Sequence, residues 1–172
     1  MKTLYLLIIS IGVFTQSFSQ KLVKNEIDEF TGKQLKRTEW ASLTAGLQSK
    51  ELKQSLVKVD SLYAINIKFM EHDKYYSISK GNEFMLKLES GEIITLNCDS
   101  SKTSCLGCGA TGFVGSQAPG LNIYFPFTKE QLKIMQNSPV SKIRIYLNEG
   151  YQEFVIKEKS SKKFSEALKT IN

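Results

Sequence analysis

Short stretches of alternating apolar and polar residues, joined by very tight turns, constrain the fold of this chain most strongly. In residues 84–88 every second residue is apolar, and the same alternation resumes in residues 94–98. This pattern is typical of half-buried strands. The intervening Glu89-Ser90-Gly91 predicts a three-residue hairpin loop with glycine in the left-handed position. Leu86 would then face Ile94 and Phe84 would face Leu96, and a loop this short demands antiparallel pairing.

Two further hairpins follow from turn sequences that lie between apolar runs. Thr31-Gly32-Lys33 separates residues 22–30 from residues 34–42, and Glu149-Gly150 separates residues 142–148 from residues 151–157. A two-residue turn at Glu149-Gly150 places Ile143 opposite Ile156 and Ile145 opposite Phe154. The apolar positions of the hairpins predict a core made of Phe84, Leu86, Ile94, Leu96, Ile143, Ile145, Phe154 and Ile156.

The rest of the chain predicts more strands and a few short helices. Residues 62–70, 75–78 and 121–126 predict strands, and residues 49–57 predict a short helix. Thr128 and Gln131 can form a capping box for a helix that ends before Pro139. A last helix is predicted from Ser160 and Ser161, with an apolar stripe made of Phe164, Leu168 and Ile171. We therefore expect an α+β fold, an antiparallel β-sheet built from hairpins and packed by two or three short helices.

The first nineteen residues have the layout of a secretory signal peptide. Lys2 supplies a positive charge, residues 4–14 are almost wholly apolar, and Ser17 and Ser19 satisfy the small-x-small rule for cleavage. The apolar run is shorter than the roughly 20 residues that span a bilayer. We expect cleavage after Ser19, which leaves residues 20–172 as one domain in the periplasm or outside the cell.

The charge of the chain is modest and spread along it. Without Lys2 the chain has 22 basic and 17 acidic residues, a net charge of +5. The densest basic stretch holds Lys157, Lys159, Lys162 and Lys163. Proteins that bind nucleic acid concentrate charge and interleave aromatic residues for stacking. Here the aromatic residues have strand-core spacing, so we interpret the stretch as a solvated helix face and expect no nucleic-acid partner.

Residues 99–120 fit no periodic pattern and are the first place to look for a binding site. Loops of this length inside a domain are usually functional or disordered. The candidate binding residues are Gly107, Gly109, Gly112 and Phe113. Residues 107–112 match the dinucleotide fingerprint Gly-x-Gly-x-x-Gly, but that fingerprint works only between a strand and a helix, and neither flanks it here. We expect no bound cofactor.

The same loop contains Cys105-Leu106-Gly107-Cys108, for which three interpretations stay open. The first is a structural disulfide or a set of buried thiols, and an oxidising compartment favours the disulfide. The second is a redox pair, although Gly109 disfavours the helix that would activate the thiolate. The third is a metal site, in which Cys98 and His72 would join the two cysteines as tetrahedral zinc ligands. We favour the disulfide, with Cys98 as a buried thiol at the end of its strand.

No catalytic constellation is found elsewhere in the sequence. The only histidine, His72, lies in the polar stretch Glu71-His72-Asp73-Lys74, which predicts an exposed turn. The patterns His-Glu-x-x-His and Gly-x-Ser-x-Gly are absent. Nothing in the sequence combines a nucleophile, a base and an oxyanion donor.

Four motifs give the chain a family resemblance. They are Asp28-Glu29-Phe30-Thr31-Gly32, Lys80-Gly81 with Leu86-Lys87-Leu88, Cys105-Leu106-Gly107-Cys108-Gly109-Ala110, and Lys142-Ile143-Arg144-Ile145. Together they resemble a family of small uncharacterised exported bacterial proteins with no assigned activity. The resemblance implies one exported domain and transfers no site residue.

The expected function is that of an exported, non-enzymatic binding or structural module, with a protein or cell-envelope partner. The alternative is a thiol- or metal-dependent activity centred on Cys105 and Cys108, and an enzyme whose site is assembled from dispersed residues also stays open.

Overall fold

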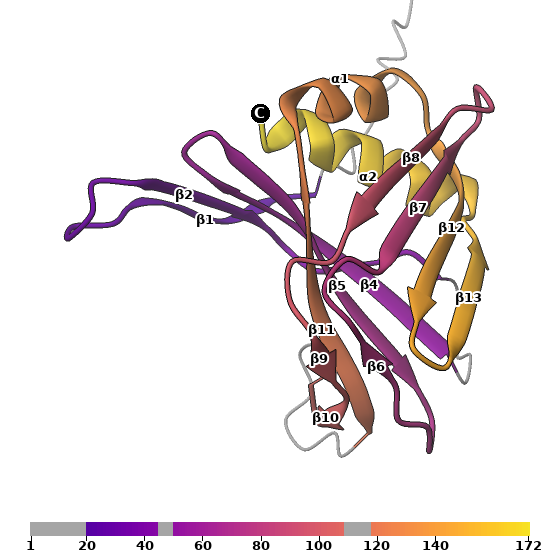
Figure 1. The fold of residues 1–172 in the computed structure, drawn as a ribbon. Coiled ribbons are helices and arrows are strands. Elements are labelled where there is room, and N and C mark those ends of the chain that lie inside the picture. Colours follow the sequence, from indigo (N-terminus) through magenta and orange to yellow (C-terminus); the bar gives the residue numbers. More distant parts are fainter. Residues whose placement is uncertain (1–19, 45–49, 109–117) are drawn as a thin grey trace, which may run out of the picture.

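A computed structural model describes residues 20–44, 50–108 and 118–172 of the chain (Figure 1). Most of these residues lie in antiparallel strands, and two helices cover one end of the sheets. This arrangement is broadly compatible with the α+β class expected from the sequence.

The larger sheet has seven strands in the order β1-β2-β4-β5-β11-β10, with β3 paired to β4. Every pair in it is antiparallel. Its outermost hairpin, β1–β2, projects away from the rest of the molecule (Figure 1). The strands are β1 (Leu22–Ile27), β2 (Gln34–Thr38), β3 (Ala41–Ser42), β4 (Lys50–Val59), β5 (Leu62–Glu71), β10 (Cys105–Leu106) and β11 (Pro119–Phe127).

The smaller sheet has four antiparallel strands in the order β13-β12-β7-β8. They are β7 (Glu83–Leu88), β8 (Ile93–Asn97), β12 (Val140–Leu147) and β13 (Gly150–Val155). A third, two-stranded sheet pairs β6 (Ser77–Ile78) with β9 (Lys102–Thr103).

The inner faces of the two main sheets pack against each other. The ring centroids of Phe84 and Phe125 lie 4.7 Å apart, and those of Phe69 and Phe154 lie 5.9 Å apart. One continuous hydrophobic cluster runs through both sheets and both helices. All eight core residues expected from the hairpins are buried, which confirms the predicted direction of their side chains.

Helix α1 (Lys129–Asn137) follows β11, and α2 (Glu158–Thr170) ends the described chain. The predicted capping box is confirmed. The backbone amide of Gln131 donates to Thr128 Oγ1, and the backbone amide of Thr128 donates to Gln131 Oε1. The apolar stripe Phe164, Leu168 and Ile171 is buried as expected. However, α2 begins two residues before Ser160, and Ser161 instead donates its hydroxyl to the carbonyl of Val140 on β12 at 2.7 Å. Neither helix is long and apolar enough to cross a bilayer, a statement that covers only the described residues.

Two of the three predicted hairpins are found, although the strand before Gly32 ends at Ile27 and not at Phe30 as predicted. Ile27 pairs with Gln34 in the β1–β2 hairpin, and Leu86 pairs with Ile94 in the β7–β8 hairpin. Gly32 and Gly91 both have positive φ, at 69° and 91°, as their turns require.

The predicted short helix over residues 49–57 is wrong, because β4 begins at Lys50 and continues to Val59. Leu52 and Leu56 are both buried on this strand, as is Gln54 between them. Gln54 is fully buried and donates its side-chain amide to Gln20 Oε1 at 2.7 Å. This buried polar residue interrupts the apolar alternation and hides the strand in the sequence.

The predicted register of the β12–β13 hairpin is also wrong. Ile143 lies opposite Phe154 and Ile145 opposite Gln152, so the two-residue turn is Asn148-Glu149. The Glu149 carboxylate accepts hydrogen bonds from the amide and hydroxyl of Ser77, at 2.9 and 2.8 Å, which fixes the turn at this position. The register differs from the predicted one by two residues, and an even shift leaves the same side chains in the core.

Candidate functional site

The structure brings Cys105 and Cys108 together at the edge of the larger sheet. Their Cα atoms are 5.3 Å apart, within the range that a disulfide bridges, and their sulfur atoms lie within bonding distance. Cys108 donates its amide to the carbonyl of Cys105 at 3.2 Å, and Gly107 has a φ of 76°. The pair therefore closes a tight turn directly after β10, and no helix follows it among the described residues.

The predicted binding loop, residues 99–120, is only partly described. Gly109, Gly112 and Phe113 lie outside the described residues, and Gly107 is in the turn that the cysteine pair closes. The expectation that this segment has no regular structure is wrong for β9, β10 and the start of β11.

The four residues of the metal hypothesis are not brought together in the part of the chain that the structure describes. That part contains no group of three or more His, Cys, Asp or Glu side chains able to hold a metal ion. The side chain of His72 is 75% exposed and lies 3.1 Å from the Asp73 carboxylate. Cys98 is a free, buried thiol whose pKa is raised by burial.

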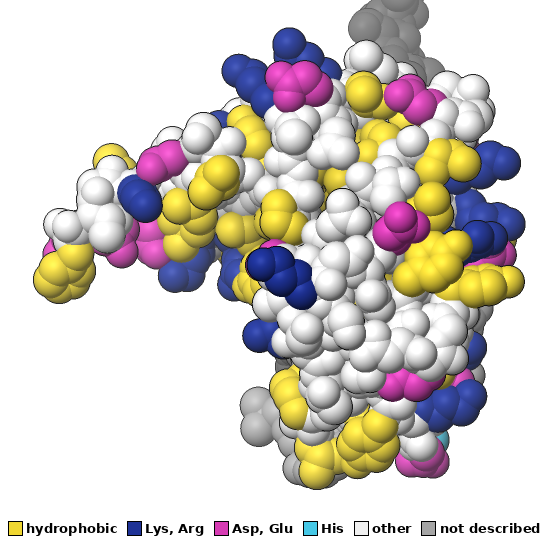
Figure 2. Space-filling model, in the orientation of Figure 1, with side chains coloured by type: hydrophobic (Ala, Val, Ile, Leu, Met, Phe, Trp, Pro, Cys, Tyr) yellow, Lys and Arg dark blue, Asp and Glu magenta, His cyan; other side chains and the backbone are white. Residues whose placement is uncertain are grey.

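The outward face of the smaller sheet gathers charged and aromatic side chains that lie apart in the sequence. Because side chains alternate along a strand, the residues between the core positions of β7, β8, β12 and β13 share this face. Lys/Arg and hydrophobic side chains lie side by side over the part of the molecule where Figure 1 places β12 and β13 (Figure 2). We call the following set the outer face: Met85, Lys87, Ile93, Lys142, Arg144, Tyr146, Tyr151, Glu153 and Val155.

Two lysines of the outer face lie directly opposite each other on neighbouring strands. The register of β7 and β12 pairs Lys87 with Lys142, and like charges in this position destabilise a sheet. The Lys142 ammonium lies 3.7 Å from the Glu153 carboxylate. Lys87 is exposed, and no hydrogen bond or ion pair to any described residue reaches its ammonium. The repulsion between the two lysines is therefore only partly offset within the chain.

Two other lysine pairs, Lys36–Lys58 and Lys53–Lys68, also face each other across strands. Each has a close compensating contact. Lys36 donates to the backbone oxygen of Asn172 at 2.8 Å, and Lys53 lies 3.0 Å from the Glu51 carboxylate. Of these three contacts, the one that serves the Lys87–Lys142 pair is the longest, at 3.7 Å between Lys142 and Glu153.

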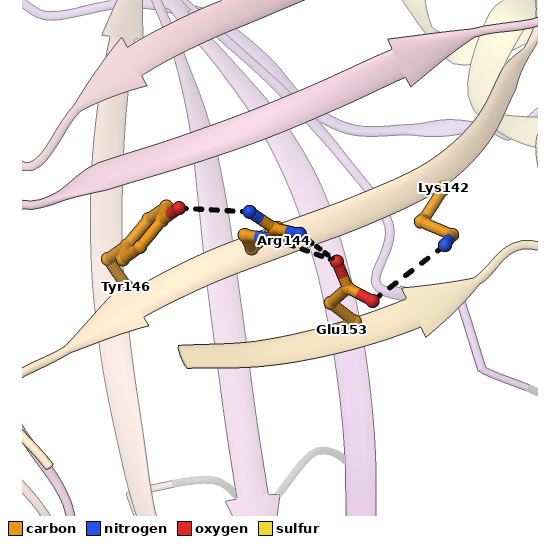
Figure 3. Close-up of polar contacts among 4 residues, drawn as sticks. All are labelled: Lys142, Arg144, Tyr146 and Glu153. Carbon is orange, nitrogen blue, oxygen red and sulfur yellow. Dashed lines mark hydrogen bonds and ion pairs between the residues drawn. The ribbon is translucent and has the colours of Figure 1, made fainter. Parts of the chain in front are cut away.

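Arg144 is held in a fixed orientation at the centre of the outer face (Figure 3). Its guanidinium binds Glu153 through two nitrogen atoms and donates to the Tyr146 hydroxyl at 3.0 Å. The same group lies 4.6 Å from the ring centroid of Tyr151. The hydrogen bonds between Arg144 and Glu153 lower the pKa of Glu153 and raise the pKa of Arg144. Glu153 is therefore a neutralised partner and not a free acid.

A shallow pocket of about 280 Å³ lies on the outer face, between the lysine pair and the Arg144–Glu153 pair. Met85 and Ile93 contribute its apolar part. Ile93 is 57% exposed and the neighbouring Val155 is 74% exposed. A partner lying here would meet three cations, one neutralised acid and several aliphatic side chains.

A second pocket, of about 380 Å³, lies beside α2. Its lining includes Gln20, Glu39, Trp40, Lys159 and Lys163. Lys162 lies on the exposed side of the same helix and forms an ion pair with Glu158 at 2.6 Å. The basic stretch near the C-terminus is therefore divided between a solvated helix face and this pocket.

A buried carboxylate at the end of β5 is surrounded by hydrogen-bond donors. Glu71 is 5% exposed, accepts the Tyr76 hydroxyl, and lies 2.7 Å from the Lys74 ammonium and 3.4 Å from that of Lys50. Burial alone would raise the pKa of Glu71, but the bonds from Lys74, Tyr76 and Lys50 outweigh it and hold the pKa below its usual value. Burial and the Glu71 contact raise the pKa of Tyr76 to about 12. This cluster is satisfied internally, so it is structural in character.

Sequence reasoning did not identify the outer face as a site. The strands that carry Lys87 and Lys142 were both predicted, but their pairing was not, and the two lysines meet only through that pairing. The available signal was the run Lys142, Arg144 and Tyr146 at alternate positions of one strand, all on its polar side.

Comparison with known proteins assigns no function to these residues. No family model matches the chain, and neither a curated protein nor a solved structure matches it.

Proposed function

We propose that the protein is an exported, non-enzymatic binding module whose outer face takes an acidic, partly aliphatic polypeptide segment. The observation that carries the proposal is the Lys87–Lys142 pair, in which two lysines lie opposite each other on neighbouring strands. A carboxylate lying between them would convert a repulsive contact into two attractive ones. Departures from local rules of this kind are expected at functional sites.

The arrangement around Arg144 supports a carboxylate ligand. Glu153, Tyr146 and Tyr151 fix the guanidinium before a partner arrives, so little side-chain entropy is lost on binding. Arg144 and the two lysines line the same shallow pocket. The flat sheet face suits a partner in an extended conformation.

The exposed aliphatic residues favour a polypeptide over a polyphosphate or a sulfated polysaccharide. Val155 lies opposite Lys142 and Ile93 lies opposite Lys87, so these two aliphatic side chains flank the lysine pair. Met85 lies opposite Arg144 and lines the pocket. Acidic and aliphatic residues alternating in an extended chain would satisfy both groups of side chains. A purely ionic polymer would leave the aliphatic surface uncovered.

The experiment is a fluorescence anisotropy titration with a labelled peptide of alternating Glu and Leu. We expect saturable binding that weakens with salt and is lost in the double variant Lys87→Gln/Lys142→Gln. The matched control, Lys80→Gln/Lys129→Gln, removes the same charge from exposed positions away from the outer face and should bind normally. Equal loss in both double variants, or equal binding of polyphosphate or heparin, contradicts the proposal.

Export is proposed on the sequence of residues 1–19, which lie outside the described residues. N-terminal sequencing of the protein recovered from outside the cytoplasm should begin at Gln20. A recovered chain that retains Lys2 contradicts the signal peptide.

A further inference from the structure

Strand β1 ends the larger sheet with an unpaired edge that is complementary to itself. Among the described residues, no strand lies on its outer side. Five of its six residues are exposed, including Val23 at 59% and Ile27 at 68%. The hairpin projects from the molecule and carries hydrophobic side chains along its length (Figures 1 and 2). Exposed apolar edges of this kind are templates for strand pairing.

We propose that two copies of the chain pair through β1, antiparallel, around a two-fold axis that passes through Asn25. This register sets Val23 against Ile27 of the second copy and Lys24 against Glu26 of the second copy. By symmetry each contact occurs twice. The interface therefore contains two apolar pairs and two pairs of opposite charge, each of which stabilises adjacent antiparallel strands.

The backbone is oriented for this register. Asp28 donates its amide to the carbonyl of Lys33 across the hairpin at 2.9 Å, and the pairing from Lys24 to Ile27 is regular. Backbone groups alternate in direction along an antiparallel strand, so those of Asn25 and Ile27 point away from β2. Asn25 can thus exchange both hydrogen bonds with its own symmetry mate. The bulge at Val23 marks the end of the regular pairing segment.

Charge selects this register over its neighbours. Moving the axis by one residue sets Lys24 against Lys24 of the second copy, or Glu26 against Glu26 of the second copy. Both place like charges opposite each other, which is unfavourable. Lys24 and Glu26 already form an ion pair within the strand at 2.9 Å, so the two charges share one face of it. A single strand pair buries little surface, so the dimer is concentration-dependent.

Site-specific oxidation tests the axis directly in the purified protein. Asn25→Cys places two thiols on Cα atoms about 5.5 Å apart, which suits a disulfide. Ile27→Cys is the matched control, because its symmetry mate lies four residues away along the strand, roughly 13 Å. We expect rapid cross-linking of Asn25→Cys alone, and equal cross-linking of both variants overturns the register.

Charge reversal followed by sedimentation tests the pairing without cysteines. Lys24→Glu and Glu26→Lys should each lower the association constant at least about fivefold, because each creates two like-charge contacts. The double variant should restore it. These positions are exposed, so the fold should persist, which circular dichroism checks. A Lys24→Glu variant that associates more strongly, or a wild-type protein that stays monomeric at millimolar concentration, overturns the proposal.

Discussion

Replacing Lys87 with glutamate should stabilise the fold while it removes the proposed binding activity. In the wild-type sheet Lys87 lies opposite Lys142, a like-charge contact, and a carboxylate in place of the Lys87 ammonium would make the pair attractive. Cross-strand charge pairs of either sign change stability by about 0.2–1 kcal/mol. The side chain of Lys142 is 45% exposed, so solvent screening holds the combined gain to roughly 0.5–1 kcal/mol. For a chain of this length that gain raises Tm by about 1–4 °C.

Differential scanning calorimetry at low salt measures the change, with Lys80→Glu as the control for net charge. The control should stay within about 0.5 kcal/mol of the wild type, because Lys80 is exposed and lies in a turn away from the outer face. Adding Lys142→Glu to Lys87→Glu recreates a like-charge pair and should remove the gain. If Lys87→Glu destabilises the protein, or if Lys80→Glu gives the same increase, the lysine pair is not a strained contact and the reasoning is refuted.

Three further predictions concern the rest of the structure. Glu71→Gln should cost roughly 1.5–3 kcal/mol at pH 7, the range for hydrogen bonds to charged groups. Since folding lowers the pKa of Glu71 from 4.5, the advantage of the wild type should disappear in urea titrations as the pH falls through that lowered pKa. Ile145→Ala should lower the free energy of unfolding by about 2–5 kcal/mol, because Ile145 is fully buried, and an unchanged denaturation midpoint contradicts its place in the core. Changing both Cys105 and Cys108 to Ser should leave the domain folded, since a bridge across so short a loop constrains the unfolded chain little. Peptide mapping of the unreduced wild-type protein should show the two cysteines linked, and free thiols would contradict the structural disulfide.

Local sequence patterns predict the hairpins well because each is fixed by a few neighbouring residues. Glu89-Ser90-Gly91 determines both the turn and the pairing of Leu86 with Ile94, and the structure confirms both. The β12–β13 turn escaped prediction because a distant residue, Ser77, binds Glu149 and holds the turn one residue earlier. The propensities of the turn residues alone cannot predict a contact with a residue so far away in the sequence.

The remaining discrepancies also have tertiary causes. The β4 strand was hidden by Gln54, a buried polar residue whose side-chain amide donates a hydrogen bond to Gln20. The outer face depends on the pairing of β7 with β12, which are separated in the sequence by more than fifty residues. Sequence reasoning therefore recovered the hairpin strands and their inward faces, but it missed β4 and could not assemble the outward face where the candidate site lies.

The burial of Gln20 bears on whether the proposed signal peptide is removed before or after folding. Gln20 is 2% exposed, and its side chain is tied to the carbonyl of Glu39 and to the Gln54 amide. A peptidase that cuts after Ser19 needs the flanking chain accessible and extended, which a docked Gln20 does not allow. The proposed cleavage would therefore precede the docking of Gln20. Under that proposal the two events have a fixed order, with cleavage first and the closing of this end of the sheet second.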